Sequence, residues 1–392
     1  MTKTTGPLDG IRVLDLSSFI AGPYAAMTLG DMGAEVIKIE PPGGDLARAW
    51  QPFLKGESRF YLGWNRNKRS ICLDIAADAG REICYQLVRR ADVVIENYRC
   101  GVTGRLRIDY DSLRAINPRL IYCSTTAFGS RGPWRERPGY DPVLQSLGGT
   151  AAANARFNGG TTAICAIAVS DYHAAMLIAA GVNAALFHRE RTGEGQRIET
   201  SLLQSIMSLQ SQYYVQALEC EEAGGLGIAP YRFFPTRDGE IFMAIATDKF
   251  WRLMCGAMNL AALGQEAKYA TNADRVKHAV ELNEILPPLF LEKTTAEWES
   301  IFNSAGVPNG SARTYAEWFD DPQVTAMEMN PVVTHPTIGP LRMHGLAVNF
   351  STTPGSIRSA PPMLGEHSDE ILRELDYCVE DIEALRASGV VK

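Results

Sequence analysis

Residues 8–45 read LDGIRVLDLSSFIAGPYAAMTLGDMGAEVIKIEPPGGD, and this stretch decides the fold. Ile11 to Leu16 is typical of a short β-strand, Gly22 to Met32 of a helix, and Ala34 to Ile39 of a second strand. A strand, a helix and a strand in this order predict a βαβ unit with parallel strands. The predicted fold class is therefore α/β.

The same alternation continues toward the C-terminus. Strands are predicted at 70–73, 93–96 and 120–125, and helices at 77–90 and around 110–116. Repeated alternation predicts an open, mostly parallel, Rossmann-like sheet with helices on both faces.

Beyond residue 127 the pattern changes twice. After a Gly-rich passage with a helical stretch near 140–147, a long apolar helix is predicted from Asp171 to the RTGEG turn at 191–195. A strand at 196–200 and a long helix through about Glu219 follow, and GGLGIAP at 224–230 marks a domain boundary. Residues 231 to about 321 predict an α+β module, with strands at 231–234 and 240–245. The remainder predicts short strands and one terminal helix capped by Ser368.

Composition restricts the class of protein. The 392 residues are 46% hydrophobic and 21% charged, which is ordinary for a globular chain of two domains. A net charge of −7 argues against nucleic acid or an anionic membrane as the main partner. Eight cysteines show no C-x-x-C pair, so no metal site is predicted. Because the start MTKTTGPLDG lacks an apolar signal core, we expect a cytoplasmic protein.

Generic catalytic motifs do not explain the chain. Between Leu16 and the first helix stands SSFIAGPY, whose one glycine cannot form the G-x-G-x-x-G turn of a dinucleotide site. No G-x-x-x-x-G-K-[ST] or G-x-S-x-G motif is present either. These patterns alone predict an enzyme that acts on an anionic small molecule, with Arg99 to Arg107 as a local basic cluster.

Ten segments together resemble family III CoA-transferases, the group of formyl-CoA transferase and carnitine CoA-transferase, and they occur in the family's order. They are residues 8–45, NRNKRSICLDI (65–75), ADVVIENYRCGVTGRL (91–106), INPRLIYCSTTAFGSRGP (116–133), GYDPVLQSLGG (139–149), AVSDYHAA (168–175), HRERTGEGQRIETSLL (188–203), APYRFFPTRDGEIFMAIATDKF (229–250), GVPNG (306–310) and LGEHSDEIL (364–372).

The resemblance implies an architecture and a set of partners. It implies a large CoA-binding α/β domain of residues 1–205 and 330–392, a linker helix at 206–224, a small α+β domain at 225–325, and an interlocked homodimer. Coenzyme A and acyl-CoA are expected as substrates together with small carboxylic acids, and no tightly bound cofactor is expected.

Asp171 matches the family's carboxylate nucleophile. Attack on an acyl-CoA would give a mixed anhydride and then an aspartyl-CoA thioester, which keep the acyl group activated. At its ordinary pKa an Asp is ionised at neutral pH. The simpler alternative is that Asp171 only caps its helix. Relatives often have Gly-Asp where this chain has Ser170-Asp171.

Other matched positions are expected to line the site, although each has an ordinary structural alternative as a surface charge or packed side chain. The CoA-binding candidates are Arg99, Arg105, Asn97, Tyr98, Ala21 and Leu73; the substrate-pocket candidates are Tyr140, Trp50, Gly224 and Gly225. Arg48, Arg66, Lys68 and Arg137 are candidate counter-charges for a small dicarboxylic or hydroxy acid.

Two other functions stay open from sequence. An α-methylacyl-CoA racemase of the same fold would need a His and a Glu for proton abstraction, where this chain has Tyr140 and Thr247. A non-catalytic acyl-CoA-binding protein would need Asp171 to be only a cap.

Overall fold

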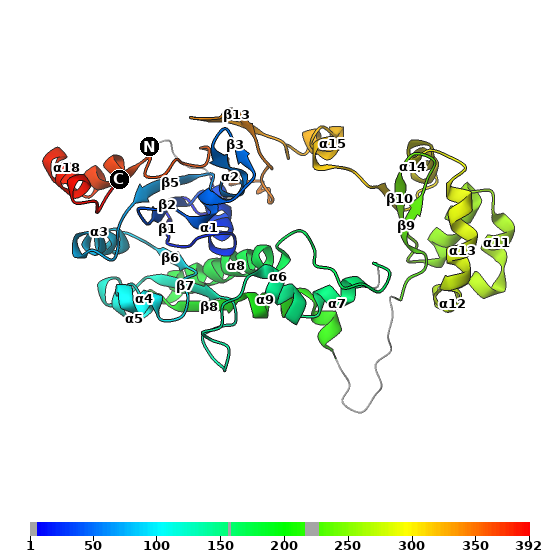
Figure 1. The fold of residues 1–392 in the computed structure, drawn as a ribbon, viewed down its shortest axis with the longest axis horizontal. Helices are drawn as coiled ribbons and strands as arrows, with labels where there is room; N and C mark the ends of the chain where they lie inside the picture. Colours follow the sequence, from blue (N-terminus) through cyan, green and yellow to red (C-terminus); the bar gives the residue numbers. More distant parts are fainter. Residues whose placement is uncertain (1–5, 156–157, 216–226) are drawn as a thin grey trace. The chain divides into compact units, whose positions relative to one another are not determined.

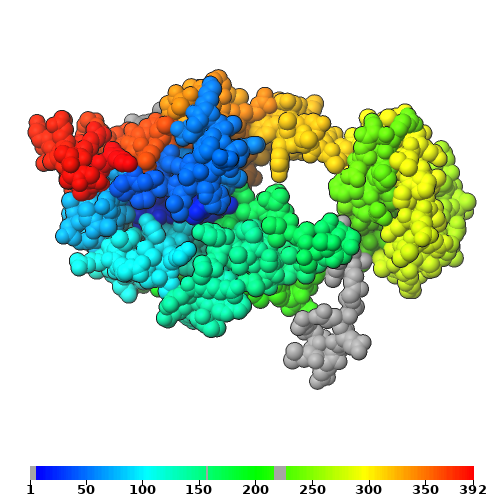
Figure 2. Space-filling model, in the orientation of Figure 1, coloured from blue at the N-terminus to red at the C-terminus, as the bar shows by residue number. Residues whose placement is uncertain are grey.

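The structure is a computed structural model that describes residues 6–155, 158–215 and 227–392. The chain forms two compact units, Met1–Val215 with Gln323–Lys392, and Gln216–Pro322. The two chain ends therefore share one unit, where the blue N-terminal and red C-terminal surfaces adjoin (Figures 1 and 2).

A six-stranded sheet organises the first unit. Its strands lie in the order β5-β2-β1-β6-β7-β8, and every neighbouring pair is parallel. The strands are β1 Arg12–Asp15, β2 Glu35–Glu40, β5 Lys68–Cys72, β6 Val93–Glu96, β7 Ile121–Thr126 and β8 Arg197–Ser201. This is the doubly wound order. Successive strands are added outward from β1 to β5 on one side, and then outward from β6 to β8 on the other, so the order of addition reverses between β1 and β6. The predicted fold class is confirmed.

Helices cover both faces of this sheet, and alternate residues of β1 show why. Leu14 packs in a cluster with side chains of α3 (Asp78–Arg89), α5 (Tyr110–Ile116), α17 (Ser368–Glu374) and α18 (Val379–Ala387). Val13 points to the other face, where α1 (Ala21–Asp31) and α8 (Val169–Thr192) pack. Successive strand residues face opposite sides of the sheet, so the side chains of an apolar run such as this one are buried on both faces.

Shorter elements complete the first unit. They are η1 Leu46–Ala49, β3 Phe53–Leu54, β4 Glu57–Ser58, α2 Arg59–Trp64, α4 Val102–Leu106, α6 Asp141–Leu147, α7 Thr150–Asn154, α9 Leu202–Leu209, η3 Ser211–Tyr214, β12 Val332–His335 and β13 Gly339–Arg342, with α16 Pro322–Ala326 at the boundary.

The second unit has its own core around a three-stranded antiparallel sheet of order β11-β10-β9. Its elements are β9 Tyr231–Pro235, β10 Glu240–Ala244, α10 Asp248–Ala257, α11 Ala261–Gln265, η4 Ala267–Tyr269, α12 Asn272–Lys277, α13 Ala279–Phe290, α14 Thr295–Ser304, β11 Asn309–Ser311 and α15 Tyr315–Phe319.

Two predictions for helix ends are wrong. The long helix predicted through about Glu219, including the linker helix from 206, ends at Leu209. There the Gln210 amide donates to the carbonyls of Ile206 (3.0 Å) and Gly148 (2.9 Å), which satisfies an end carbonyl and ties the chain to another segment. Residues 216–224 of that predicted helix lie outside the described residues.

At the C-terminus, Ser368 is the first residue of α17 and does not cap it. Its hydroxyl instead accepts a hydrogen bond from the N–H of Cys72 (3.3 Å), which attaches the helix to β5. A second terminal helix, α18, follows the one that was predicted. In the described part of the chain, no helix has the length and apolar character needed to cross a membrane.

Candidate active site

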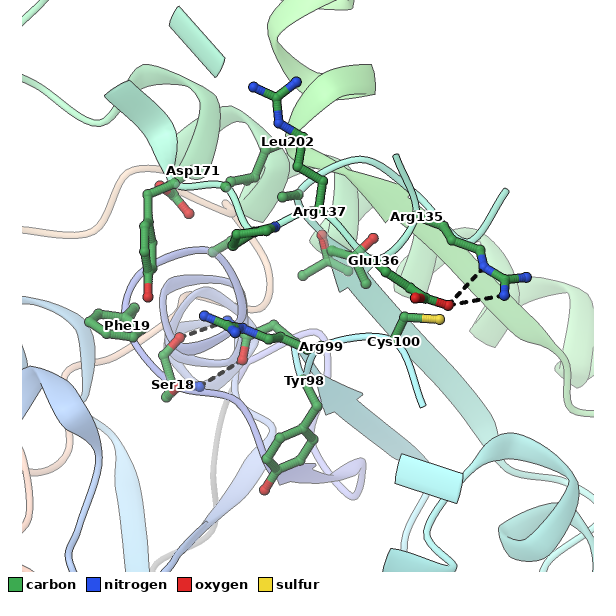
Figure 3. A pocket seen from close by; sticks show the side chains of 18 of the residues that line it. Ser18, Phe19, Tyr98, Arg99, Cys100, Arg135, Glu136, Arg137, Asp171 and Leu202 are labelled. Atoms are coloured by element: carbon green, nitrogen blue, oxygen red, sulfur yellow. Dashed lines mark hydrogen bonds and ion pairs between the residues drawn. The ribbon is translucent and has the colours of Figure 1, made fainter. Parts of the chain in front are cut away.

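A cleft of about 400 Å³ opens where β1 and β6 end, at the reversal point of the sheet. Its walls come from the loop after β1, from residues 97–100 after β6, from residues 135–140, and from Asp171 in the first turn of α8 (Figure 3). Ligands of doubly wound proteins bind at this place because loops diverge there above the carboxyl ends of the strands.

The side chain of Asn97 holds the loop after β1. It accepts from the N–H of Ser18 (2.9 Å) and donates to the Ser18 carbonyl (2.7 Å). Phe19, the next residue, has a φ of 63°, a conformation that is rare for a side chain of this size. Its ring centroid lies 4.8 Å from that of Trp50 and 5.7 Å from that of Tyr140.

The one glycine of the SSFIAGPY stretch is the second residue of α1 and has a packing role. A Cβ on Gly22 would lie 2.2 Å from the Ser17 hydroxyl oxygen, so only glycine lets α1 begin this close to the end of β1. Gly22 therefore lets helix and strand pack closely, as one glycine of the dinucleotide motif does.

Three of the four predicted counter-charges form ion pairs with carboxylates of the protein itself. Arg66 binds Asp31, Arg48 binds Glu40 (2.7 Å), and Lys68 lies 2.8 Å from the Asp15 carboxylate. These three cations are not available to a substrate, so the prediction for them is wrong. Arg137 alone of the four lines the cleft, where its guanidinium lies 4.7 Å from the ring centroid of Trp134.

Asp171 is the third residue of α8 and its carboxylate faces the cleft. Ala168 is the N-cap residue and makes no side-chain cap, so the interpretation of Asp171 as the N-cap is wrong. The backbone N–H of Ala21, at the start of α1, is directed at the Asp171 carboxylate and acts to lower its pKa. Two helix N-termini, each with a partial positive charge, thus meet at this carboxylate.

Burial raises the pKa of Asp171 to about 7, with a further contribution from the nearby Asp141 carboxylate. The Ala21 N–H acts in the opposite direction and lowers the pKa. The expectation that Asp171 has an ordinary pKa is therefore wrong. At neutral pH the free protein holds this carboxyl group near its titration midpoint, as expected for a desolvated reactive group.

Five of the other predicted site residues line the same cleft: Arg99, Asn97, Tyr98, Ala21 and Tyr140. Arg99 extends across it on the side of Ser18 (Figure 3). Partial burial raises the pKa of the Tyr98 hydroxyl to about 12, so this phenol stays protonated.

The remaining predicted site residues lie elsewhere. Arg105 is exposed on α4 and does not line the cleft, and Leu73 is buried in the core. Trp50 reaches the cleft only through its contact with Phe19. Gly224 and Gly225 lie outside the described residues.

Sequence reasoning missed Asp141 as part of this site. The residue is buried at the start of α6 and faces the first turn of α8. Its signal in the sequence is Asp141-Pro142, an acid and a proline at the start of a helical stretch, which is typical of a helix N-terminus. That signal gives no indication that the carboxylate serves a different helix.

The fold and site define a class: a doubly wound α/β protein with a desolvated carboxylate in the cleft at the reversal point of its sheet. The family model described as CoA-transferase family III matches residues 8–368. The chain belongs to this family, as its sequence motifs predicted.

Relatives of known name align with this chain over nearly its whole length. The chain is 36% identical to the succinyl-CoA:glutarate CoA-transferase of Mus musculus, covering 98% of this chain and 90% of that one. It is 35% identical to the succinate–glutarate CoA-transferase of Agrobacterium fabrum, covering 96% and 97%. A crystal structure of a CAIB/BAIF family protein from Brucella suis is 33% identical, with a TM-score of 0.83 over 95% of this chain and 100% of that chain.

Proposed function

We propose that the protein transfers CoA from an acyl-CoA donor to a carboxylic acid acceptor through covalent intermediates on Asp171. The observation that carries this proposal is the Asp171 carboxylate itself, which is desolvated, faces the cleft and lies in the first turn of α8 with the Ala21 N–H directed at it. A carboxylate stripped of water is a better nucleophile than one that is fully hydrated.

The reaction has four steps that conserve the activation of the acyl group. An Asp171 carboxylate oxygen attacks the donor thioester carbonyl, and the C–S bond breaks to give a mixed anhydride and CoA thiolate. The thiolate attacks the Asp171 carboxyl carbon and releases the donor acid, which leaves an aspartyl-CoA thioester. The acceptor carboxylate then attacks that thioester carbon, forming a new mixed anhydride and thiolate. The thiolate attacks the acceptor acyl carbon, giving the product acyl-CoA and free Asp171.

The Ala21 N–H supports attack at the Asp171 carboxyl carbon. Attack by thiolate or by acceptor carboxylate places negative charge on a carboxyl oxygen of Asp171. A backbone donor already directed at this group stabilises that charge without reorganisation. Ala21, predicted as a residue that lines the CoA site, is therefore proposed to act through its main chain.

A small dicarboxylic acid is the proposed acceptor class. The mouse and Agrobacterium relatives are named for succinyl-CoA or succinate and for glutarate. Arg99 and Arg137 line the cleft and make no ion pair with any described residue. These two guanidinium groups are therefore proposed to bind the CoA phosphates and the acceptor's second carboxylate.

We also propose a homodimer, supported by the outer face of α8. Met176, Ala180, Ala184 and Phe187 follow one another at helical spacing and are exposed in the single chain, with Phe187 65% exposed. A 24-residue helix that is apolar on its outer face as well as its inner face is normally covered on both sides.

Mass spectrometry tests the function. The protein is incubated with succinyl-CoA, with acetyl-CoA and with a panel of dicarboxylic, hydroxy and monocarboxylic acids. We expect a CoA or acyl adduct on Asp171 and new acyl-CoA products, both absent in Asp171→Ala. Transfer by Asp171→Ala at the wild-type rate would end the proposal. Deuterium entering the α-carbon without an adduct would support a racemase, and binding alone would support an acyl-CoA-binding protein.

A further inference from the structure

We propose that Ser170 and Asp141 form a positioning pair that holds the first turn of α8, so that Asp171 presents its carboxylate to the cleft. This inference rests on the proposed function, because it assigns a role in placing the nucleophile. Neither residue touches the reacting atoms, and both act through Asp171.

Ser170 is fully buried and binds Asp141 twice. One oxygen of Asp141, Oδ1, accepts from the Ser170 N–H (2.8 Å) and from the Ser170 hydroxyl (2.7 Å). Ala168, the N-cap residue of α8, provides no side-chain acceptor for the N–H groups of the first turn. Asp141, from a different helix, supplies that acceptor for the Ser170 N–H. The residue that directly precedes the nucleophile is therefore fixed by two bonds to one carboxylate oxygen.

Asp141 is itself held in place. Its other oxygen, Oδ2, accepts from the Gln145 amide (2.6 Å), one turn further along α6. Gln145 also binds the chain that leads into α8, accepting from the Cys165 N–H (2.7 Å) and donating to the carbonyls of Cys165 and Ile167. The position of the pair is thus set by α6 and by the segment just before α8.

A third helix fixes Ser170 from its carbonyl side. The Ser205 hydroxyl of α9 donates to the Ser170 carbonyl (2.6 Å). Nδ1 of His173 lies 3.0 Å from the Ser205 carbonyl, which joins α8 to α9 one turn later. All three polar groups of Ser170 are therefore engaged, and Asp171 has little freedom to turn away from the cleft.

The pair also determines the charge near the nucleophile. Two hydrogen bonds from Ser170 and one from Gln145 hold the Asp141 carboxylate in place near Asp171. That carboxylate contributes to the raised pKa of Asp171, after burial itself. The other charged groups on the cleft walls are Arg99, Arg135, Glu136 and Arg137, and Arg135 is paired with Glu136 (3.0 Å).

Asp141→Asn, Asp141→Ala and Ser170→Ala test the pair in the full-length protein. Asp141→Asn keeps an acceptor for Ser170 but removes the negative charge. The acid limb of the plot of kcat against pH should therefore shift to lower pH by about one unit. Asp141→Ala removes the anchor, and kcat should fall about 100-fold with KM for acyl-CoA nearly unchanged. Ser170→Ala keeps the N–H bond and loses the hydroxyl bond, for a fall of about fivefold.

Asp238→Asn is the matched control. Oδ1 of Asp238 also accepts from the N–H (2.8 Å) and hydroxyl (3.0 Å) of one residue, Thr295, at the start of α14 in the other unit. This variant should lose stability as Asp141→Asn does, without any change in the pH profile.

The outcomes separate the two proposals. Wild-type kcat and pH profiles in the Asp141 variants and in Ser170→Ala would overturn the positioning role, whatever the change in melting temperature. Ser170→Ala carries the kinetic test if the Asp141 variants do not fold. If the wild-type protein transfers no CoA, the proposed function fails. Carbon-13 NMR titration of the Asp171 carboxyl then tests the pair, and the same titration midpoint in wild type and Ser170→Ala would overturn it.

Discussion

The backbone N–H of Ala21 is directed at the Asp171 carboxylate, so the N-terminus of α1 meets the first turn of α8. These residues are 150 positions apart in the sequence. The contact exists because α1 and α8 lie side by side on one face of the sheet (Figure 1). It places a hydrogen-bond donor at the one carboxylate in the cleft that burial has made hard to ionise.

Activity should rise with pH through neutrality. The nucleophile must be deprotonated, and burial followed by the Asp141 charge raises the pKa of Asp171 to about 7. Single-turnover rates of adduct formation should therefore increase about tenfold for each pH unit below that value and level off above it. A rate that stays constant from about pH 5 to pH 8 would show that Asp171 titrates as an ordinary carboxyl.

Asp171→Asn should make the protein more stable at alkaline pH. A carboxyl group with a raised folded-state pKa favours folding while protonated, and this contribution is lost as the pH rises from about 4 to about 7. The neutral amide avoids that loss. We expect a gain of about 1–2 kcal/mol at pH 8 after allowing for partial solvent screening, and less than about 0.5 kcal/mol at pH 4, measured by urea unfolding.

Asp109→Asn provides a control of opposite sign. Burial acts to raise the pKa of Asp109, but hydrogen bonds from the Ser112 hydroxyl and N–H outweigh it and lower the pKa. This variant should therefore lose stability at neutral pH. A gain in both variants would mean that removal of net negative charge, and not the local environment of Asp171, explains the result.

Lys68→Met should be strongly destabilising. The Lys68 ammonium group is fully buried and binds the Asp15 carboxylate (2.8 Å), the Asn65 amide oxygen (2.7 Å) and the Pro23 carbonyl (2.8 Å). Removing one partner of a buried ion pair costs about 3–5 kcal/mol. Lys277→Met, at an exposed pair with Asp274, should change the free energy of unfolding by less than about 0.5 kcal/mol. Equal effects would contradict the buried role of Lys68.

Much of the fold could be predicted from the sequence because it depends on local patterns. The apolar run of β1 and the alternation of strands with helices specify a parallel sheet before any tertiary contact is known. The end of α9 was missed because Gln210 stops that helix by binding a distant carbonyl, that of Gly148. The family motifs predicted that Asp171 and Arg99 belong to one site, and both line the same cleft, Asp171 from the first turn of α8 and Arg99 from the segment after β6.

What could not be predicted is the environment of each charged group. Nothing local distinguishes Lys68, which is paired inside the protein, from Arg137, which faces the cleft. The raised pKa of Asp171 likewise depends on burial and on Asp141, thirty residues earlier. Both are properties of tertiary packing, so they follow only from the structure.

Asn97→Ala should reduce catalysis more than it reduces binding. The Asn97 amide was expected to line the CoA site, but its oxygen and nitrogen are both bound to Ser18. Loss of these bonds frees the loop that leads to the Ala21 N–H, and a misplaced donor should reduce kcat about 10- to 100-fold. KM for acyl-CoA should change by less than about threefold. A large rise in KM with kcat unchanged would instead support direct contact with CoA.

Arg99 and Arg105 give the sharpest test of how CoA is held. Both were predicted to bind CoA, but only Arg99 lines the cleft, whereas Arg105 is exposed on α4. A charge-assisted bond to phosphate contributes about 1.5–3 kcal/mol, so Arg99→Gln should raise KM for acyl-CoA about 10- to 100-fold with kcat nearly unchanged. Arg105→Gln should change KM less than about twofold, and KM for the acceptor acid in both variants separates CoA binding from acid binding. If Arg105→Gln raises KM for acyl-CoA as much as Arg99→Gln does, CoA extends over α4 and the cleft is only part of its site.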